Sequence, residues 1–157
     1  MSTFVAGKRS LEKMESLHKD LVLLIQESFK VSQVDFTVIE CGRTTERQQM
    51  LFDTGKSKVN PKKYSPEVLI TKGKHIINEH RKLSDAFDFI VYVKGKGKLA
   101  YDRSHLMYLI GVFTSVGNRL FQDGKISKKI RSGANWDMDG ELIYDQRFLD
   151  APHIERV

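Results

Sequence analysis

The sequence predicts an α+β fold, a small antiparallel sheet flanked by helices, in a single domain that spans residues 1–157. Apolar residues recur at helical spacing in residues 9–30 and 103–121, whereas residues 34–40 and 86–93 have the β-branched and aromatic composition of strands. These segments alternate along the chain without any internal repeat. This order of elements is typical of an α+β domain.

The first predicted element is one amphipathic helix over residues 9–30. Its apolar residues recur at spacings of three and four, and Ser10 stands where an N-cap is expected. Residues 34–40, VDFTVIE, then alternate as a half-buried strand does. A helix and a strand therefore open the predicted domain.

A short helix and a loop are predicted next. Thr44 or Thr45 caps this helix after the break at Gly42, and Gly55 ends it. Residues 58–74 contain prolines and many lysines, a composition that predicts a long surface loop.

The clearest strand of the chain is AFDFIVYV, residues 86–93. It is continuous and rich in β-branched and aromatic residues, which predicts a central place in the sheet. Residues 103–121 predict a second, strongly apolar helix. The tail from Lys125 carries turn residues and short strands, the last of them in residues 151–157, APHIERV.

Composition narrows the classes of protein to consider. A hydrophobic fraction of 40% and a charged fraction of 29% exclude a disordered chain. The net charge of +6 favours an anionic partner such as nucleic acid, a membrane surface or a bacterial cell wall. The single cysteine, Cys41, excludes an internal disulfide and a cysteine-based zinc site.

Targeting signals are not expected in this sequence. No apolar run reaches the roughly 18 residues that a membrane span needs, so no membrane insertion is predicted. The first residues, MSTFVAGKRS, are followed by a stretch too polar for the apolar region of a signal peptide. The protein is therefore expected to need help if it acts outside the cytoplasm.

Because the chain has one cysteine, any metal site in it must be built from histidine and carboxylate ligands. The sequence has five histidines. His18 and His105 lie on helical segments and are interpreted as ordinary, partly exposed residues. His75 and His80 precede the central strand, and His153 lies in the last one. The second group is the better source of ligands.

Asp88 is unusual because it lies inside the apolar run AFDFIVYV. A buried carboxylate is seldom tolerated without a partner, so Asp88 is either ion-paired or part of a site. Two histidines and one carboxylate form a catalytic zinc arrangement, in which the metal acidifies water and polarises a carbonyl group. Asp150 lies three residues before His153, with Pro152 between them, and is placed to act as a general base.

Three separated stretches carry motifs that resemble those of one known family. Residues 9–58 contain a helix, a strand that leads into Gly-Arg-Thr and a glutamine-bearing helix that closes with Gly-x-Ser. Residues 71–93 contain a histidine and then Ala-x-Asp, and residues 133–157 contain Gly-x-x-Trp and Asp-x-Pro-His-x-Glu. In this order they resemble the zinc peptidases of bacterial cell-wall metabolism. That family includes D-alanyl-D-alanine carboxypeptidases and the L-alanyl-D-glutamate endopeptidases that bacteriophages use as endolysins.

The resemblance implies roles for individual residues around a zinc-centred active-site cleft. Three ligands would bind Zn²⁺, namely His75, Asp88 and His153. Asp150 would be the catalytic base, and Arg43 would hold the substrate or stabilise the oxyanion. Gln48 would contact the substrate or support the residues that do, and Trp136 would line the cleft.

The first metal ligand is where the sequence departs from the family pattern. Gly73 replaces the usual serine, and the interval from His75 to Asp88 is longer than in the common form. Counting the common interval back from Asp88 leads to Arg81, which is not a histidine. His80 is one position away from that point. His75 is preferred, because a surface loop absorbs insertions cheaply, whereas a slip of one residue beside a strand turns a side chain away. His80 stays an alternative.

The leading hypothesis is a zinc peptidoglycan peptidase that cuts the stem peptide between L-alanine and D-glutamate and serves as a phage endolysin. Its partner would be peptidoglycan and not nucleic acid, and it would act as a monomer. It would accumulate in the host cytoplasm and reach the wall through a holin. A D-alanyl-D-alanine carboxypeptidase of the same fold is the close alternative. The lysine-rich residues 56–64, 93–98 and 124–131 motivate another class, a non-catalytic nucleic-acid or wall-binding protein, although solvated loops explain them more simply.

Overall fold

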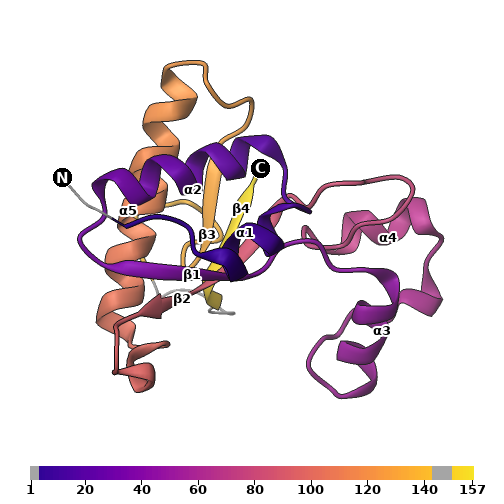
Figure 1. Ribbon diagram of the computed structural model, residues 1–157. Helices are drawn as coiled ribbons and strands as arrows, with labels where there is room; N and C mark the ends of the chain where they lie inside the picture. The colour runs from indigo at the N-terminus through magenta and orange to yellow at the C-terminus, as the bar shows by residue number, and fades with distance from the viewer. Residues whose placement is uncertain (1–3, 143–149) are drawn as a thin grey trace.

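The computed structural model describes residues 4–142 and 150–157, and it contains a four-stranded antiparallel sheet (Figure 1). In spatial order the strands are β1 (Asp35–Glu40), β2 (Ala86–Tyr92), β4 (Asp150–Arg156) and β3 (Ile130–Gly133). Each neighbouring pair is antiparallel. The predicted α+β class is confirmed.

The helices fall into two groups. Three belong to the body of the molecule: α1 (Lys8–Met14), α2 (Lys19–Val31) and α5 (Arg103–Gln122). Two helices and a short 3₁₀ turn project from it, at the right of Figure 1: α3 (Thr45–Asp53), η1 (Pro61–Lys63) and α4 (Pro66–Lys72). A further 3₁₀ turn, η2 (Gly97–Leu99), follows β2. In the described part of the chain, no helix combines the length and apolar character needed to cross a membrane.

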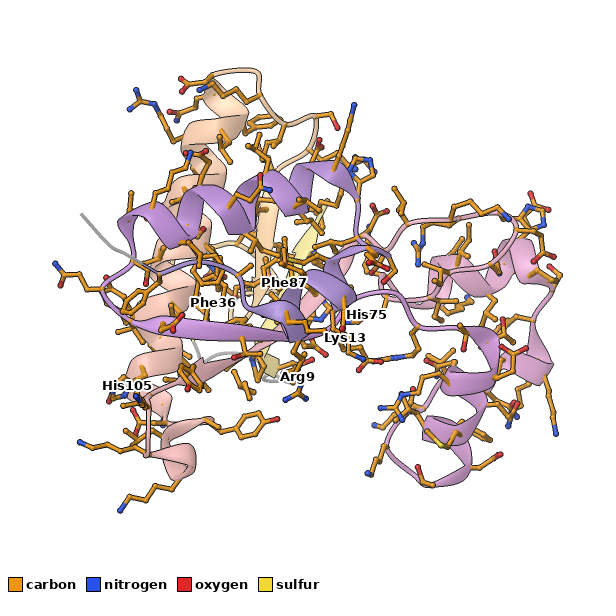
Figure 2. The ribbon with its side chains drawn as sticks, viewed as in Figure 1. Arg9, Lys13, Phe36, His75, Phe87 and His105 are labelled. Atoms are coloured by element: carbon orange, nitrogen blue, oxygen red, sulfur yellow. The ribbon has the colours of Figure 1, made fainter. Side chains whose placement is uncertain are left out.

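The core lies between the sheet and the α5 helix, which contacts β2, β3 and β4 and also packs against α2. Phe87 and Phe89 of β2 are fully buried on this side, and Phe113 of α5 meets their rings at centroid distances of 5.3 and 4.9 Å. Figure 2 shows Phe87, together with Phe36 of β1, inside the body. Asp88 lies between the two phenylalanines and therefore points to the opposite face.

Strand β4 alternates in the same way. Ile154 is fully buried in the hydrophobic core, and its two neighbours, His153 and Glu155, point to the other face. The sheet therefore has one apolar face under the helices and one face that carries polar side chains.

Several expected elements are confirmed. The strand predicted over residues 86–93 is β2, which lies between β1 and β4, and the helix predicted over residues 103–121 is α5. Thr44 caps α3 by accepting a hydrogen bond from the N–H of Arg47. The chain leaves α3 at Gly55, whose φ of 74° suits glycine.

The single helix predicted over residues 9–30 is wrong, because the chain forms α1 and α2 with a break between them. The backbone of the break bonds to a distant segment: Ser84 N–H donates to the carbonyl of Ser16, and His18 N–H donates to the carbonyl of Ser84. Groups that a continuous helix would use are thus satisfied elsewhere. The ring of His18 then caps α2 by accepting from the N–H of Asp20.

Ser10 is not an N-cap. The α1 helix begins at Lys8 with Gly7 in the capping position and no side-chain cap. Ser10 is buried, and its hydroxyl oxygen accepts a hydrogen bond from the N–H of Val38 at 3.0 Å. It therefore joins α1 to β1.

The surface loop predicted over residues 58–74 is wrong in part, because η1 and α4 lie within it. Ser65 caps α4, and Pro66 occupies its first turn. Proline is favoured there, since its fixed φ suits a helix and its missing N–H would have no helical partner. The prolines therefore mark a helix start as well as a loop.

The tail agrees with the prediction of short strands where it is described. Strand β3 falls in the first part of the tail, and β4 contains the predicted final strand. Residues 143–149, which belong to the same predicted stretch, lie outside the described residues.

Candidate metal centre

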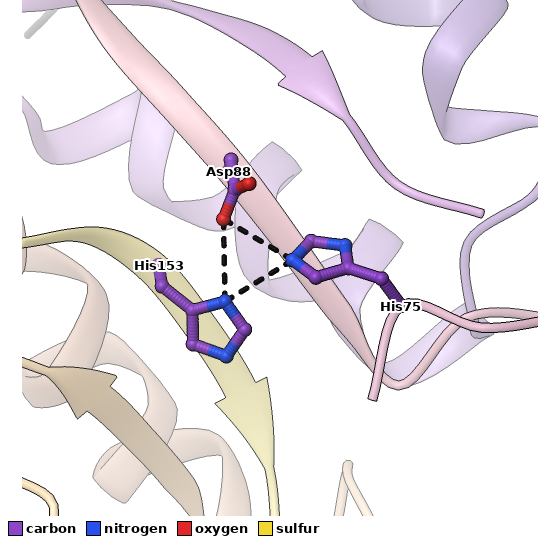
Figure 3. A group of neighbouring side chains, drawn as sticks. All are labelled: His75, Asp88 and His153. Atoms are coloured by element: carbon purple, nitrogen blue, oxygen red, sulfur yellow. Dashed lines mark hydrogen bonds and ion pairs between the residues drawn. The ribbon is translucent and has the colours of Figure 1, made fainter. Parts of the chain in front are cut away.

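Three side chains from distant parts of the sequence meet on the polar face of the sheet (Figure 3): His75, Asp88 and His153. Their facing atoms form a nearly equilateral triangle. Nε2 of His75 lies 3.2 Å from Oδ1 of Asp88 and 3.1 Å from Nδ1 of His153, and Nδ1 of His153 lies 3.2 Å from Oδ1 of Asp88. Ligands of a tetrahedral zinc ion, with bonds near 2.0 Å, lie about 3.3 Å apart. The triangle therefore has the size of one face of such a tetrahedron.

Strand pairing brings two of these residues together. Asp88 and His153 are direct partners in the antiparallel register of β2 and β4. Residues opposed in this way project to the same face of a sheet with their Cβ atoms roughly 5 Å apart. Since Phe87 and Phe89 take the helix-covered face, both Asp88 and His153 must emerge on the other one.

His75 comes from the segment between α4 and β2, and neighbouring backbone bonds fix it. Its carbonyl oxygen accepts the N–H of Arg43 at 2.8 Å, and the carbonyl of Arg43 accepts the N–H of Ile77 at 2.9 Å. On the other side, the carbonyl of Lys74 accepts the N–H of Asp85 at 2.9 Å. The backbone that carries this buried ring is thus held by hydrogen bonds on both sides.

The outer nitrogen of each ring sets its tautomer. Nδ1 of His75 donates to the carbonyl oxygen of Cys41 at 2.8 Å, and Nε2 of His153 donates to Oε2 of Glu155 at 2.8 Å. Both partners are acceptors, so each ring keeps a proton on its outer nitrogen, and a neutral ring then turns its lone pair inward. With Oδ1 of Asp88, three acceptor atoms face one another. Such a donor set fits a cation at its centre.

The electrostatics of the centre agree with this. Burial disfavours the charge on Asp88, but the contacts of its carboxyl group with the rings of His153 and His75 outweigh burial and hold the pKa of the carboxyl well below its ordinary value. Burial also disfavours a charged His153, yet Asp88 and Glu155 raise the pKa of that ring to about 9. The surroundings of the triangle therefore favour positive charge.

Glu155 was not expected in the site. It is buried, and while Oε2 accepts from His153, Oε1 accepts from Nε of Arg131 at 3.0 Å. Burial raises the pKa of Glu155, but the bonds from His153 and Arg131 outweigh burial and lower it overall. The sequence does contain a signal, since a residue two places after His153 on a strand shares its face.

Arg43 lies beside the centre with two of its nitrogens already engaged. Nε donates to Oε1 of Glu40 at 2.9 Å, and Nη1 donates to Oε1 of Gln48 at 3.2 Å. Within the described residues, Nη2 of Arg43 has no hydrogen-bond partner. The side chain is therefore fixed in place and retains a free donor.

Gln48 lies behind Arg43, where it is 1% exposed. Its amide nitrogen donates to the hydroxyl of Ser57 at 2.9 Å and to the carbonyl of Val59 at 2.8 Å. Gln48 therefore connects Arg43 to the chain that follows α3. Its direct contact with a substrate stays a prediction.

A hollow of about 360 Å³ opens between the start of α3 and the turn after His75. Thr44, Ile77 and Lys82 are among the residues that line it. Because Thr44 follows Arg43 and Ile77 bonds to the Arg43 backbone, the hollow adjoins the Arg43 side of the centre.

Trp136 lies beside the centre on the β3 side. Its ring centroid is 5.3 Å from that of His153, and the guanidinium of Arg131 lies 5.4 Å from the centre of the Trp136 ring. Arg131 also donates to the Trp136 carbonyl at 3.1 Å. Trp136 and Glu155 thus share Arg131 as a common partner.

Asp150 opens β4 at an irregularity in the sheet. Ser132 pairs with Ile154, but the next residue, Gly133, pairs with Asp150, where a regular ladder would place His153. A side chain at Gly133 would collide with the carbonyl of Asp150, so glycine permits the close approach. The bulge shifts Asp150 out of the simple alternation of the strand.

The electrostatic surroundings place Asp150 near the same centre. Burial and the charge of Asp88 raise the pKa of Asp150, and the charges of His153, His75 and Arg43 oppose the rise without cancelling it. The expected base therefore interacts electrostatically with all three candidate ligands.

The remaining histidines lie elsewhere. His80 is exposed in a turn, His18 caps α2, and His105 pairs with Asp102 at the start of α5. Of the two alternatives for the first ligand, the structure brings His75 to the triangle.

Sequence comparison identifies the family of this chain, and fold comparison finds a similar solved structure. All of residues 1–157 match the family described as phage L-alanyl-D-glutamate peptidase. The chain belongs to this family. Among curated proteins, it is 26% identical over 158 residues to the L-alanyl-D-glutamate peptidase of Escherichia phage T5, which covers 99% of each chain. Its fold resembles the crystal structure of the Serratia marcescens L-Ala D-Glu endopeptidase ChiX, with a TM-score of 0.64, 19% sequence identity, and coverage of 96% of this chain and 87% of that one.

Membership of the phage L-alanyl-D-glutamate peptidases confirms the function expected from the motifs. The protein is a hydrolase, an endopeptidase that acts on the stem peptide of peptidoglycan. This favours the endopeptidase over the carboxypeptidase alternative and over a non-catalytic binding protein. The group formed by His75, Asp88 and His153 is a candidate metal site consistent with a metallopeptidase.

Proposed function

We propose that this phage peptidase uses Zn²⁺ held by His75, Asp88 and His153. The observation that carries the proposal is the triangle of three inward-facing acceptor atoms, 3.1 to 3.2 Å apart. Imidazole nitrogen and carboxylate oxygen are ordinary zinc ligands, and three protein ligands leave one tetrahedral position open for chemistry. When bound, zinc supplies a Lewis acid that polarises the scissile carbonyl and lowers the pKa of water.

Asp150 acts as the general base. It accepts a proton from the water that attacks the carbonyl carbon of the L-Ala–D-Glu bond and returns it to the leaving amine. Its raised pKa supports this role, since a carboxylate of higher pKa is a better proton acceptor. The bulge at Gly133 lets Asp150 and His153 serve the same centre from one strand.

Arg43 stabilises the negative charge that gathers on the carbonyl oxygen. The donor for this contact is Nη2, which has no hydrogen-bond partner among residues 4–142 and 150–157, and Glu40 and Gln48 hold the guanidinium so that it need not reorganise during the reaction. Trp136 borders the substrate cleft on the opposite side. Gln48 acts on the substrate through Arg43.

Glu155 and Arg131 position His153. The carboxylate of Glu155 holds the ring proton on Nε2, so that Nδ1 keeps its lone pair for the metal. Arg131 balances the buried charge of Glu155. The pair is thus a support for the ligand and does not touch the substrate.

The biological role proposed for the enzyme is that of an endolysin in phage release. Residues 1–157 act as one catalytic domain and as a monomer. A holin gives the enzyme access from the host cytoplasm to the cell wall. The match to a phage family with a peptidoglycan substrate supports this role.

Metal analysis of two matched histidine variants tests the centre. His75→Ala should lose bound zinc, whereas His80→Ala, an exposed histidine nearby in sequence, should keep one ion per chain. Release of amino groups from purified peptidoglycan should stop with a chelator and return with Zn²⁺. Loss of zinc in His80→Ala with retention in His75→Ala would reverse the assignment.

Asp150→Asn tests the base separately from the metal. This variant should retain zinc and lose hydrolysis, because the amide cannot accept the proton. Product analysis adds a check on the bond: the new amino terminus should be glutamate. Release of free D-alanine instead would identify a carboxypeptidase.

A further inference from the structure

The positive charge of the protein is concentrated in one part of the chain. Residues 44–82, which we call the basic lobe, contain nine lysines and arginines and four acidic residues, a net charge of +5. The whole chain has a net charge of +6. The rest of the molecule is therefore almost neutral.

The basic lobe is also a separate unit of packing. It contains α3, η1 and α4, which project from the sheet and its helices in Figure 1. Its buried apolar residues, Leu51, Leu69 and Ile76, do not belong to the hydrophobic cluster that fills the body. The charge of the lobe therefore lies outside the part of the molecule that holds the main core.

Four lysines are close together in the connection between α3 and α4: Lys56, Lys58, Lys62 and Lys63. All four are exposed, and in the described part of the chain none forms an ion pair with a carboxylate. Like charges left unpaired repel one another and weaken the folded state. A partner of opposite charge would remove this cost.

The lysine-rich connection is tied to the catalytic region. Gln48 donates to Ser57 and Val59, which lie among these lysines, and it accepts from Arg43 beside the metal centre. One buried side chain thus links the charged surface to the proposed substrate-binding arginine. An anion bound on the lobe would lie on the Arg43 side of the site.

We infer that the basic lobe docks the enzyme on peptidoglycan by binding the free carboxylates of its stem peptides. The inference rests on peptidoglycan being the substrate. A stem peptide carries a free carboxylate on its D-glutamate and others toward its end, and the polymer displays many such peptides. The field of the lobe reaches about 10 Å at 0.1 M salt, enough to hold peptides next to the one in the site. The lobe then helps to hold the enzyme on the polymer while the site acts on one stem peptide.

A pair of charge-matched variants tests this. The lobe variant is Lys56→Gln, Lys58→Gln, Lys62→Gln and Lys63→Gln. The control is Lys94→Gln, Lys96→Gln, Lys98→Gln and Lys125→Gln. The control lysines are also exposed and unpaired in the described structure, and those of residues 94–98 follow β2 at the end of the molecule away from α3 and α4 (Figure 1). Each variant loses four positive charges from the net +6.

Two measurements separate docking from catalysis. The metal-loaded proteins are pelleted with purified sacculi on ice, and hydrolysis of a short soluble peptide containing the L-Ala–D-Glu bond is followed separately. The lobe variant should bind sacculi about tenfold more weakly, the combined effect expected of four exposed charge pairs, and should cut the soluble peptide at the wild-type rate. The control should match the wild type in both. Raising the salt should weaken wild-type binding toward that of the lobe variant.

Other results would overturn the inference. Equal loss of binding in the control would assign the effect to net charge, and tighter binding to DNA or to anionic lipid vesicles than to sacculi would assign the lobe to another partner. Unchanged pelleting of the lobe variant would exclude docking by these lysines. Failure of the wild type to cut the soluble peptide would count against the proposed chemistry, whereas pelleting would still report on docking.

Discussion

On β2, Phe87 and Phe89 point into the apolar core beneath α5, while Asp88 between them points to the metal centre. On β4, Ile154 enters the same core, and His153 and Glu155 on either side of it face the centre. Neighbouring residues of one strand thus have different roles: those on one face stabilise the core, and those on the other face form the metal centre. Substitutions on the two faces should therefore have different effects.

The largest effect is expected from Asp88→Asn on the polar face. The amide has nearly the same shape but cannot supply an anionic ligand, so zinc should be lost and hydrolysis should fall by roughly a thousandfold, about 4 kcal/mol. Unfolding should stay cooperative, because the apolar face is untouched. Metal analysis, peptide hydrolysis and circular dichroism measure these three quantities.

Asp102→Asn is the matched control for that variant. Asp102 pairs with His105 at the start of α5, in a partly exposed position outside the triangle. It should keep its zinc and its activity. Full zinc occupancy in Asp88→Asn would contradict the proposed ligand set.

Phe113→Ala should give the opposite result on the helix-covered face. The ring of Phe113 contacts those of Phe36, Phe87 and Phe89, and deleting it should lower the free energy of unfolding by about 3 to 5 kcal/mol. The zinc content per folded chain should be unchanged. Urea unfolding of the metal-free protein and metal analysis of the folded fraction test this, and zinc loss from folded Phe113→Ala would show that the two faces are coupled.

The features that sequence could predict are mostly local. The alternation of Phe87, Asp88 and Phe89 predicts a strand with an acidic side chain on the face opposite the core. Thr44 and Gly55 indicate the two ends of α3 by their ordinary capping preferences. The motifs indicated the family, and the resemblance to that family implied that His75 and His153 share a site with Asp88. None of these steps requires knowledge of a distant backbone.

The features that sequence missed depend on such distant contacts. The helix predicted over residues 9–30 breaks because Ser84 supplies hydrogen bonds to Ser16 and His18. The hydrogen bond from His75 to the backbone carbonyl of Cys41 could not be predicted from residue types, since every residue has a carbonyl. Local propensity cannot report a partner that only the fold brings near.

Glu155→Gln is a milder test of the polar face. Gln can still accept from Nε2 of His153 but loses the charge that Arg131 balances, so zinc affinity should fall by about 10- to 100-fold without loss of the fold. Competition with a chelator of known affinity measures the change, and ¹⁵N spectra of the His153 ring report its tautomer. Glu12→Gln, at an exposed position of α1, is the control. Wild-type affinity in Glu155→Gln would exclude a positioning role.

At the end of β4, the face that carries the apolar core also carries a cluster of charged side chains. Arg156 follows Ile154 by two positions and lies on the same side, where its Nη1 is 3.6 Å from Asp20 of α2 and its Nε is 3.5 Å from Asp85. Asp20 also accepts from the N–H and hydroxyl of Ser127 at 3.0 and 2.8 Å. This cluster joins α2, the start of β2 and the end of β4, and it should make part of the stability depend on pH.

The smallest predicted effect is that of Asp20→Asn on acid stability. Burial raises the pKa of Asp20, but the bonds from Ser127 and the charges of Arg156 and His18 outweigh it and lower the pKa below its ordinary value of 3.8. The stabilisation is therefore present above that value and is lost as the pH falls through the lower pKa of the folded state. Asp20→Asn should lower the free energy of unfolding by about 1 kcal/mol at neutral pH and flatten its decline in acid. Denaturant titrations from pH 6 down to pH 2 test this against Asp123→Asn, whose ion pair with Arg119 is exposed, and an equally steep decline in Asp20→Asn would place the acid sensitivity elsewhere.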